Sequence, residues 1–302
     1  MNELINKHYS VRFDSFELVR DGGSFAYAAV SDGKKYFMRV IKPAFFDTAV
    51  SGVDVQYFLQ NKNFPVPSIV LTNDGKSCVH EKRDDGDYLY VMYEYVEGVE
   101  SEPAQDAKKI GALIGNLHLL MRDYSGQLSK RDKHFFVGRY LDILRKKQYK
   151  KVVEFESYGD ELWDKIKNLP RGYSHGDMYS GNIRKTADGK LYALDFDTSC
   201  EGFPIYDLAV ICNMTDFFVY DESKLITTKA VFEEMLPEYQ KFNSISEAEI
   251  NSFYDMIALY HFALQATIME IHGIDCVDSV FLDNQLDWLY KWKEQCNQLL
   301  CY

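Results

Sequence analysis

The 302-residue sequence has no uninterrupted apolar run of the roughly 18 residues that a membrane-spanning helix requires. Its longest apolar segment, residues 256–271, is interrupted by His261, Gln265 and Glu270, and this pattern predicts a buried helix. The first residues lack a basic stretch followed by an apolar core, the pattern of an export signal. We therefore expect a cytoplasmic protein that does not associate with a membrane.

Cysteines with the spacing of a zinc site are also missing. The six cysteines include no C-x-x-C pair and no zinc-type pairing with histidine, so we expect them to be reduced thiols. Basic residues are outnumbered, with 34 Lys and Arg against 46 Asp and Glu, and the net charge is −12. This charge argues against a nucleic-acid partner or an anionic membrane surface, and it is compatible with a cationic ligand.

The remaining pattern predicts an α+β protein with two lobes. Hydrophobic residues make up 46% of the chain and aromatic residues 15%, which indicates a packed globular protein. Short β-rich runs separated by turn signals occupy residues 16–95, with one helix expected at 50–61. Helical spacing dominates after Gly98. We expect a small antiparallel-sheet lobe at residues 1–97 and a larger, mostly helical lobe at 98–302.

The strongest motif is "SHGDMYSGN", residues 174–182, followed by "LYALDFD", which ends at Asp197. The first matches the kinase catalytic loop H-x-D-x-x-x-x-N at His175, Asp177 and Asn182. In the second, Asp195-Phe196-Asp197 stands where kinases have Asp-Phe-Gly, on a predicted β-hairpin. Oxygen ligands of this kind suit Mg²⁺. Two acidic turns would be the simpler interpretation of either stretch alone, but the two motifs together favour a reaction centre.

Three longer stretches carry a family resemblance. They are "IGALIGNLHLL" at 110–120, "SHGDMYSGNI" at 174–183 and "LYALDFDTSCEGFPIYDLA" at 191–209. The chain resembles the aminoglycoside phosphotransferase and choline kinase superfamily, which shares the protein-kinase-like fold. That family typically has His-Gly-Asp in its catalytic loop, a carboxylate in place of the Gly of Asp-Phe-Gly, and a closing Tyr-Asp-Leu-Ala.

The resemblance implies that the lobe at 1–97 binds the nucleotide and that the lobe at 98–302 carries catalysis and binds the acceptor. It also implies a role for each motif residue. Asp177 would be the catalytic carboxylate that orients the hydroxyl of the acceptor. Asn182 and Asp195 would bind Mg²⁺ and, through it, the phosphate oxygens.

Three further residues would support this centre. His175 would be structural and hold the loop. Asp197 would either assist a second metal ion or brace the loop. Asp207 would secure the catalytic loop from the helix that follows.

The nucleotide end of the resemblance rests on less specific signals. Gly22, Gly23 and Ser24 lie where a phosphate-binding loop would join the first two strands, although neither G-x-G-x-x-G nor G-x-x-x-x-G-K-[ST] is present. A plain hairpin turn is the alternative for these residues. On the third strand Arg39 stands where protein kinases have the phosphate-binding Lys. Alternation places Phe37 on the same face.

The acid that would hold Arg39 is missing from its aligned position on the next helix, which is Gly52. Asp54 is the candidate we name for its partner. The stretch "VMYEYVEG" resembles the hinge between kinase lobes. In this stretch Tyr93 would be the gatekeeper residue, and the backbone of three residues would form hydrogen bonds with the adenine edge. These hinge residues are Glu94, Tyr95 and Val96.

The acceptor is expected to be a small molecule. Only a short segment separates Asp197 from "YDLA", so the platform on which protein kinases dock peptides is absent. The expected activity is Mg²⁺-dependent transfer from ATP, with GTP as the alternative donor. The acceptor would be a hydroxyl of an aminoglycoside, an amino alcohol or a sugar. Two alternatives are a bacterial Ser/Thr protein kinase of the same superfamily and a non-catalytic nucleotide-binding module.

Overall fold

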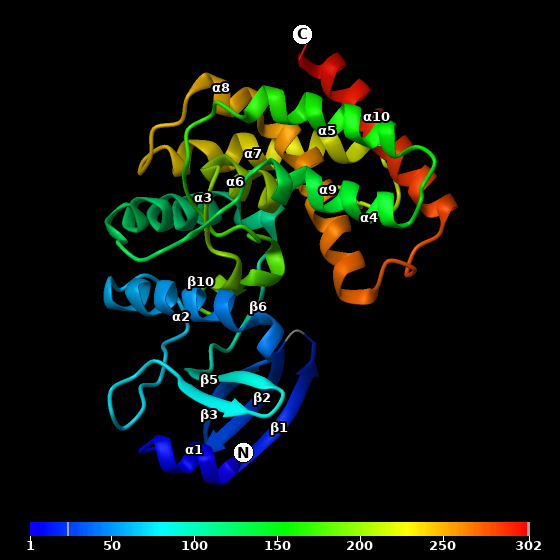
Figure 1. Cartoon of the computed structure of the whole chain (residues 1–302). Helices are drawn as coiled ribbons and strands as arrows, with labels where there is room; N and C mark the ends of the chain where they lie inside the picture. The colour runs from blue at the N-terminus through cyan, green and yellow to red at the C-terminus, as the bar shows by residue number, and fades with distance from the viewer. Residues whose placement is uncertain (23, 301–302) are drawn as a thin grey trace. The chain divides into compact units, whose positions relative to one another are not determined.

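The structure is a computed structural model that describes residues 1–22 and 24–300 (Figure 1). The chain divides into two compact units. The strand-rich unit consists of Met1–Ser101, Leu120–Leu128 and Ser180–Ser199. The helical unit consists of Glu102–Leu119, Ser129–Tyr179 and the chain from Cys200 onward. An antiparallel sheet in the N-terminal region and helices in the C-terminal region confirm the predicted α+β class.

The strand-rich unit is built on a five-stranded antiparallel sheet in the order β1-β2-β3-β5-β4. Its strands are β1 (Ser15–Asp21), β2 (Ser24–Ser31), β3 (Lys34–Ile41), β4 (Val79–Arg83) and β5 (Gly86–Glu94). The four predicted strands are β1, β2, β3 and β5. The sequence analysis missed β4 because this edge strand, "VHEKR", is mostly exposed and lacks apolar alternation.

Two helices cover opposite faces of this sheet (Figure 1). Side chains from α1 (Asn2–His8) pack with Met38, Val40 and Met92. On the other face, side chains from α2 (Phe46–Asn61) pack with Ile41 and Val91. Because strand neighbours point to opposite faces, β3 and β5 contribute to both cores. Helix α2 begins at Phe46, earlier than the predicted residue 50, after the short helix η1 (Pro43–Phe45).

The predicted hairpin is present and belongs to the strand-rich unit. Strands β9 (Ile183–Lys185) and β10 (Leu191–Ala193) pair antiparallel, and β6 (Val99–Glu100) pairs with β9. The short helices η4 (Ser180–Asn182) and η5 (Phe196–Thr198) lie directly before and after this hairpin, and η2 (Met121–Asp123) belongs to the same unit. The helix η5 packs against α2, so this hairpin delivers Asp195 and Asp197 to one face of the sheet domain.

The helical unit has an aromatic core around α9. Tyr140, Phe155 and Phe262 pack with edge-to-face geometry at centroid distances of 5.3, 5.8 and 5.9 Å. The helices are α3 (Pro103–Leu120), η3 (His134–Gly138), α4 (Arg139–Lys146), α5 (Val152–Ile166), α6 (Pro204–Cys212), α7 (Ser223–Tyr239), α8 (Glu247–Asn251), α9 (Phe253–His272) and α10 (Ser279–Leu300). A small sheet holds β7 (Ser129–Lys130), β8 (Gly172–Ser174) and β11 (Cys200–Gly202).

The apolar segment at 256–271 forms most of α9, as predicted, and most of its side chains are buried. Among the described residues, no helix combines the length and the apolar character needed to cross a membrane.

Candidate active site

The strand-rich unit contains a cavity of about 420 Å³ on the α2 face of the sheet. Phe37, Arg39 and Ile41 of β3 all line it, as alternation along the strand predicts. The other lining residues are Arg20, Ser24, Ala26, Phe45, Gln56, Pro67, Tyr93, Glu94, Tyr95, Val96, Asn182, Arg184, Leu194, Asp195 and Asp197. The cavity therefore gathers the expected nucleotide-binding cation and the two expected metal ligands from segments far apart in the sequence.

Arg39 contacts two carboxylates that the hairpin delivers. Its Nη1 lies 3.1 Å from Oδ1 of Asp197 and its Nη2 lies 2.5 Å from Oδ2, which is a two-pronged contact, while Nη1 also lies 3.2 Å from Oδ1 of Asp195. Burial alone lowers the pKa of Arg39, but the charges of Asp195 and Asp197 outweigh burial and raise it. The guanidinium is therefore positively charged inside the cavity.

The partner predicted for Arg39, Asp54, is wrong. Asp54 is exposed on α2, and the carboxylates at Arg39 come from residues 195 and 197. Gly52, at the position aligned with the kinase acid, packs directly against the backbone of η5. Sequence could not reveal this partner because 158 residues separate Asp197 from Arg39.

The turn between β1 and β2 lies beside the cavity. Ser24 lines the cavity, and the backbone N–H of Gly22 donates to the carbonyl of Ser24 at 3.2 Å. Lys42 donates to the Gly22 carbonyl at 2.8 Å and pairs with Asp21 at 2.7 Å, so it ties the turn to the end of β3. Gly23, the third residue predicted here, lies outside the described residues.

Sequence analysis missed Arg20, which also lines the cavity. Strand β1 has an irregularity in its register, since Leu18 pairs with Tyr27 and Arg20 pairs with Ala26. This is a β-bulge at Val19, and a bulge changes the face to which the following side chain points. Ala26 in turn pairs with Arg39, so Arg20 and Arg39 share one row across the sheet. No alternation rule would find this residue, because the bulge interrupts the alternation.

The predicted hinge lines the same cavity. Tyr93 is 4% exposed, and burial raises the pKa of its hydroxyl. The backbone N–H of Glu94 donates to the Ser68 carbonyl at 2.8 Å. Glu94, Tyr95 and Val96 are brought together with Arg39, as a kinase-like nucleotide site requires.

Asn182 and Asp195 both line the cavity, and each side chain carries an oxygen of the kind that magnesium prefers. The backbone N–H of Leu194 donates to the Asn182 carbonyl at 2.9 Å and holds the two segments together. Asp195 adopts a left-handed conformation with φ of 60°, which is uncommon outside glycine and frequent at functional sites. The described residues contain no group of three His, Cys, Asp or Glu side chains that could hold a metal ion. Magnesium would therefore take phosphate oxygens and water as further ligands, which is its usual habit in nucleotide sites.

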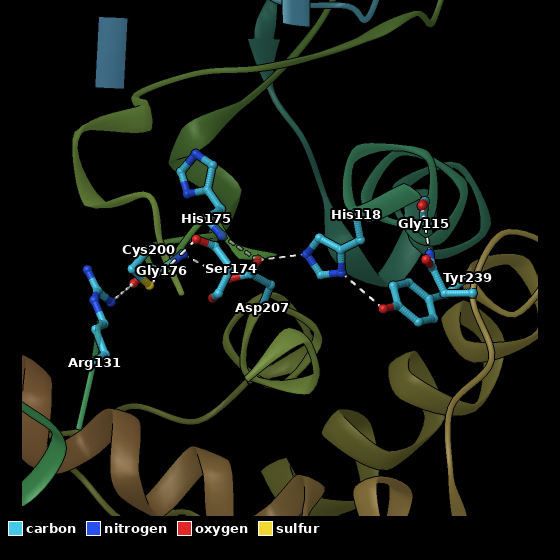
Figure 2. Close-up of polar contacts among 10 residues, drawn as sticks. Gly115, His118, Arg131, Ser174, His175, Gly176, Cys200, Asp207 and Tyr239 are labelled. Atoms are coloured by element: carbon cyan, nitrogen blue, oxygen red, sulfur yellow. Dashed lines mark hydrogen bonds and ion pairs between the residues drawn. The ribbon is translucent and has the colours of Figure 1, made fainter. Parts of the chain in front are cut away.

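In the helical unit, a buried carboxylate holds the catalytic-loop sequence. Asp207, in the first turn of α6, accepts hydrogen bonds from the Ser174 hydroxyl at 2.8 Å and from the backbone N–H groups of His175 and Gly176 at 2.6 and 2.9 Å (Figure 2). His175 itself is fully buried. Asp207 thus fixes the backbone of the two residues that precede Asp177.

A histidine on α3 completes this network. Nε2 of His118 lies 2.9 Å from Oδ2 of Asp207, and its Nδ1 lies 3.0 Å from the hydroxyl of Tyr239 on α7 (Figure 2). Burial raises the pKa of Asp207, but hydrogen bonding and charge from His118 and the donated N–H groups outweigh it and lower the pKa below its ordinary value. Asp207 is therefore ionised inside the unit.

Gly176 requires the freedom of glycine. Its φ is +83°, a conformation in which other residues are strained. Its N–H donates to Asp207, and its carbonyl accepts from Nη1 of the buried Arg131 at 3.0 Å. Arg131 also stacks over the ring of Phe135 at 4.0 Å. No local pattern points to Arg131, since its partner Gly176 lies 45 residues away.

Asp177 lies near a series of aromatic rings. Burial raises the pKa of Tyr206 and of Tyr260, and the charge of Asp177 raises both further. Tyr260 packs edge to face on Phe217 at 5.3 Å, and Phe217 stacks with Trp288 at 5.7 Å. Tyr206 and Trp288 are buried, so it is the half-buried ring of Tyr260 that offers apolar and π surface near the predicted catalytic carboxylate.

Three acidic side chains near the C-terminal helices have basic or hydroxyl partners of their own. Glu270 pairs with Arg139, and Asp275 lies 3.2 Å from Lys147. Asp283 accepts from Tyr149 and pairs with Lys151, both at 2.7 Å. These acids are therefore paired charges at the surface.

Comparison with known proteins identifies related sequences and folds. A family described as a phosphotransferase enzyme family matches residues 15–237. A homoserine kinase of Hyphomonas neptunium is 22% identical over 260 residues, which cover 76% of each chain. A second homoserine kinase, from Bartonella henselae, is 25% identical over 224 residues, covering 68% of this chain and 66% of the relative.

Two solved structures have the same fold. The amicoumacin kinase hAmiN, in complex with AMP-PNP, Ca²⁺ and Ami, has a TM-score of 0.77 and 17% identity, covering 98% of this chain and 96% of that one. A microcompartment-associated aminopropanol kinase has a TM-score of 0.75 and 17% identity, covering 99% and 96%. This likeness confirms the predicted protein-kinase-like fold.

Proposed function

Because the chain belongs to the phosphotransferase enzyme family, we propose that it transfers the γ-phosphate of ATP to a hydroxyl group of a small molecule. The observation that carries the proposal is the cavity of the strand-rich unit, which Arg39, Asn182 and Asp195 line together with the hinge. Phosphoryl transfer from a nucleotide needs a cation that binds the phosphates, oxygen ligands for the metal ion and a site for the nucleobase. These residues supply all three.

In this proposal the cavity binds the nucleotide. The backbone of Glu94 to Val96 pairs with the adenine edge, and the guanidinium of Arg39 binds phosphate oxygens. Ser24 and Arg20, which line the same cavity, add donors for the phosphates. Asn182 and Asp195 hold Mg²⁺, which, when bound, neutralises charge that develops on the transferred phosphoryl group.

Asp177 acts on the acceptor. Its carboxylate accepts the hydrogen bond of the acceptor hydroxyl and orients the oxygen for attack. His175 and Asp207 keep the loop in place, since Asp207 binds the two backbone N–H groups just before Asp177. The chain needs no further base, because a dissociative phosphoryl transfer demands little proton removal before the transition state.

The acceptor we propose is an amino alcohol. The relatives include homoserine kinases and an aminopropanol kinase by name. The half-buried ring of Tyr260 lies near the negative charge of Asp177, and an aromatic ring beside a carboxylate attracts an ammonium group. The net charge of −12 favours the approach of such a cation.

The test is a panel of amino alcohols, aminoglycosides and sugars incubated with ATP and Mg²⁺ and scored by ADP release. We expect turnover with at least one amino alcohol, and we expect Asp177→Asn to lower it by about a hundredfold or more. Replacing ATP with GTP measures the choice of donor, and omitting Mg²⁺ measures the metal requirement.

Two outcomes would contradict the proposal. Labelled phosphate on Ser or Thr of the protein itself, without turnover of any small molecule, would favour a protein kinase. Stabilisation by nucleotide without turnover of any acceptor would favour a nucleotide-binding module.

A further inference from the structure

The contact between Arg39 and Asp197 differs in kind from the contact between Arg39 and Asp195. Both oxygens of Asp197 face the guanidinium, at 3.1 and 2.5 Å, whereas Asp195 offers one oxygen at 3.2 Å. The side chain of Asp197 is 20% exposed and that of Asp195 is 49% exposed. A two-pronged contact fixes the plane of the guanidinium as well as its position. Asp197 is therefore the better anchor of the two.

Helix α2 has no room for an acid of its own at this point. A Cβ atom placed on Gly52 would lie 2.9 Å from the Cα and N atoms of Asp197 and 2.9 Å from the carbonyl carbon of Phe196. These are backbone atoms, and Phe196 is 1% exposed, so they cannot yield as the end of a flexible side chain does. The space that a longer side chain at position 52 would need is filled by η5.

We propose that Asp197 is the positioning residue of Arg39, in place of a helix-borne acid, and that Gly52 is required because it lets η5 approach α2. The inference rests on the proposed function, in which Arg39 binds the nucleotide phosphates. As a ligand of magnesium, Asp195 would give up its single contact with Arg39, and Asp197 would keep the guanidinium in the cavity. Asp197 is then not a metal ligand.

The test is a double-mutant cycle on ATP affinity, measured by calorimetry with the full chain. The four proteins are wild type, Arg39→Met, Asp197→Asn and the double variant, each titrated with ATP in EDTA and again with Mg²⁺. In EDTA we expect each single variant to weaken binding about tenfold and the double variant to be no weaker than either, because the residues act as one unit. In the titrations with Mg²⁺, we expect the Mg²⁺ concentration at half-maximal ATP binding to equal the wild-type value in Asp197→Asn. We expect it to rise in a fifth protein, Asp195→Asn.

Two further variants address the role of α2. Gly52→Ala keeps every charge, so we expect it to weaken ATP binding about as much as Asp197→Asn through displacement of η5. Asp54→Asn, on the exposed side of the same helix, is the matched control and should bind ATP as wild type does.

An Asp197→Asn protein with normal ATP affinity in EDTA and a raised Mg²⁺ requirement would overturn the inference and make Asp197 a metal ligand. Additive effects in the cycle would also overturn it. A wild-type chain that binds no ATP would instead overturn the proposed function. In that case the thermal unfolding midpoints of the same four proteins test the Arg39–Asp197 pair. Non-additive shifts of the midpoint support the pair, and additive shifts refute it.

Discussion

His261 is a fully buried histidine on α9 that stacks on Trp288 at a centroid distance of 4.7 Å. Burial lowers its pKa to about 3, so the folded chain keeps it neutral at pH values where an unfolded histidine, with a pKa near 6.5, takes up a proton. The contribution of neutral His261 to the free energy of unfolding is therefore fully present above about pH 6.5. It is lost as the pH falls from there toward 3, at about 1.4 kcal/mol per pH unit.

Replacement of this histidine by a ring that does not titrate should remove that pH dependence. We expect the drop in unfolding midpoint between pH 7.5 and pH 5 to be smaller in His261→Phe than in wild type. All three tryptophans, at 163, 288 and 292, lie in the helical unit, so tryptophan fluorescence during heating follows the relevant transition. His272→Phe, at the exposed end of the same helix, is the control. An equal drop in His261→Phe and wild type would show that protonation of His261 does not destabilise the folded chain.

At the scale of elements, two glycines allow α3 to approach α7 and the turn after it. A Cβ on Gly111 would collide with the Met235 carbonyl and lie 2.9 Å from its Cγ, and one on Gly115 would lie 2.9 Å from the ring of Phe242. The Gly115 carbonyl accepts from Nδ2 of Asn243 at 2.7 Å. Close approach places His118 of α3 against Tyr239 of α7, so the contact between these helices supports the network around Asp207.

We expect Gly111→Ala to destabilise the helical unit by about 1–3 kcal/mol, because overpacking outweighs the better helix propensity of alanine. Thermal unfolding followed by tryptophan fluorescence measures this, and turnover should fall with it as His118 shifts. Lys108→Ala, an exposed position of the same helix, should unfold at the wild-type temperature. A Gly111→Ala protein of raised stability would mean that α3 has room to move.

The elements that sequence predicts well are those in which one local pattern decides. Strand β3 alternates in burial over most of its length, β5 is a continuous apolar run, and α9 is apolar over most of its length. The motif spacing singled out Asn182, Asp195 and Asp197, which line the cavity with Arg39, while their roles stay predictions. Partners that lie far apart in the sequence could not be predicted. The contact of Asp197 with Arg39 and that of Arg131 with Gly176 both depend on tertiary packing. Arg20 was missed because a bulge changes its face, and the polar β4 because it forms only by pairing with β5.

At the scale of the whole molecule, the predicted roles divide between the two units. Asn182 and Asp195 belong to the strand-rich unit with the cavity, and Asp177 belongs to the helical unit. Only four residues of sequence lie between Asp177 and Asn182, yet their proposed tasks differ, since one acts on the acceptor and the other on the metal and nucleotide. Binding and transfer should therefore respond separately to substitution.

Nucleotide-induced stabilisation distinguishes the two tasks. Wild type with Mg²⁺ and ATP at a hundred times its dissociation constant should gain about 2.7 kcal/mol of stability, seen as a rise in unfolding midpoint. Asp177→Ala should keep this rise and lose turnover, because its carboxylate orients the acceptor. Asp195→Ala should lose most of the rise as well as turnover, because the metal and the phosphates lose a ligand. If Asp177→Ala loses the rise to the same degree as Asp195→Ala, then Asp177 takes part in binding the nucleotide, and its assignment to the acceptor is wrong.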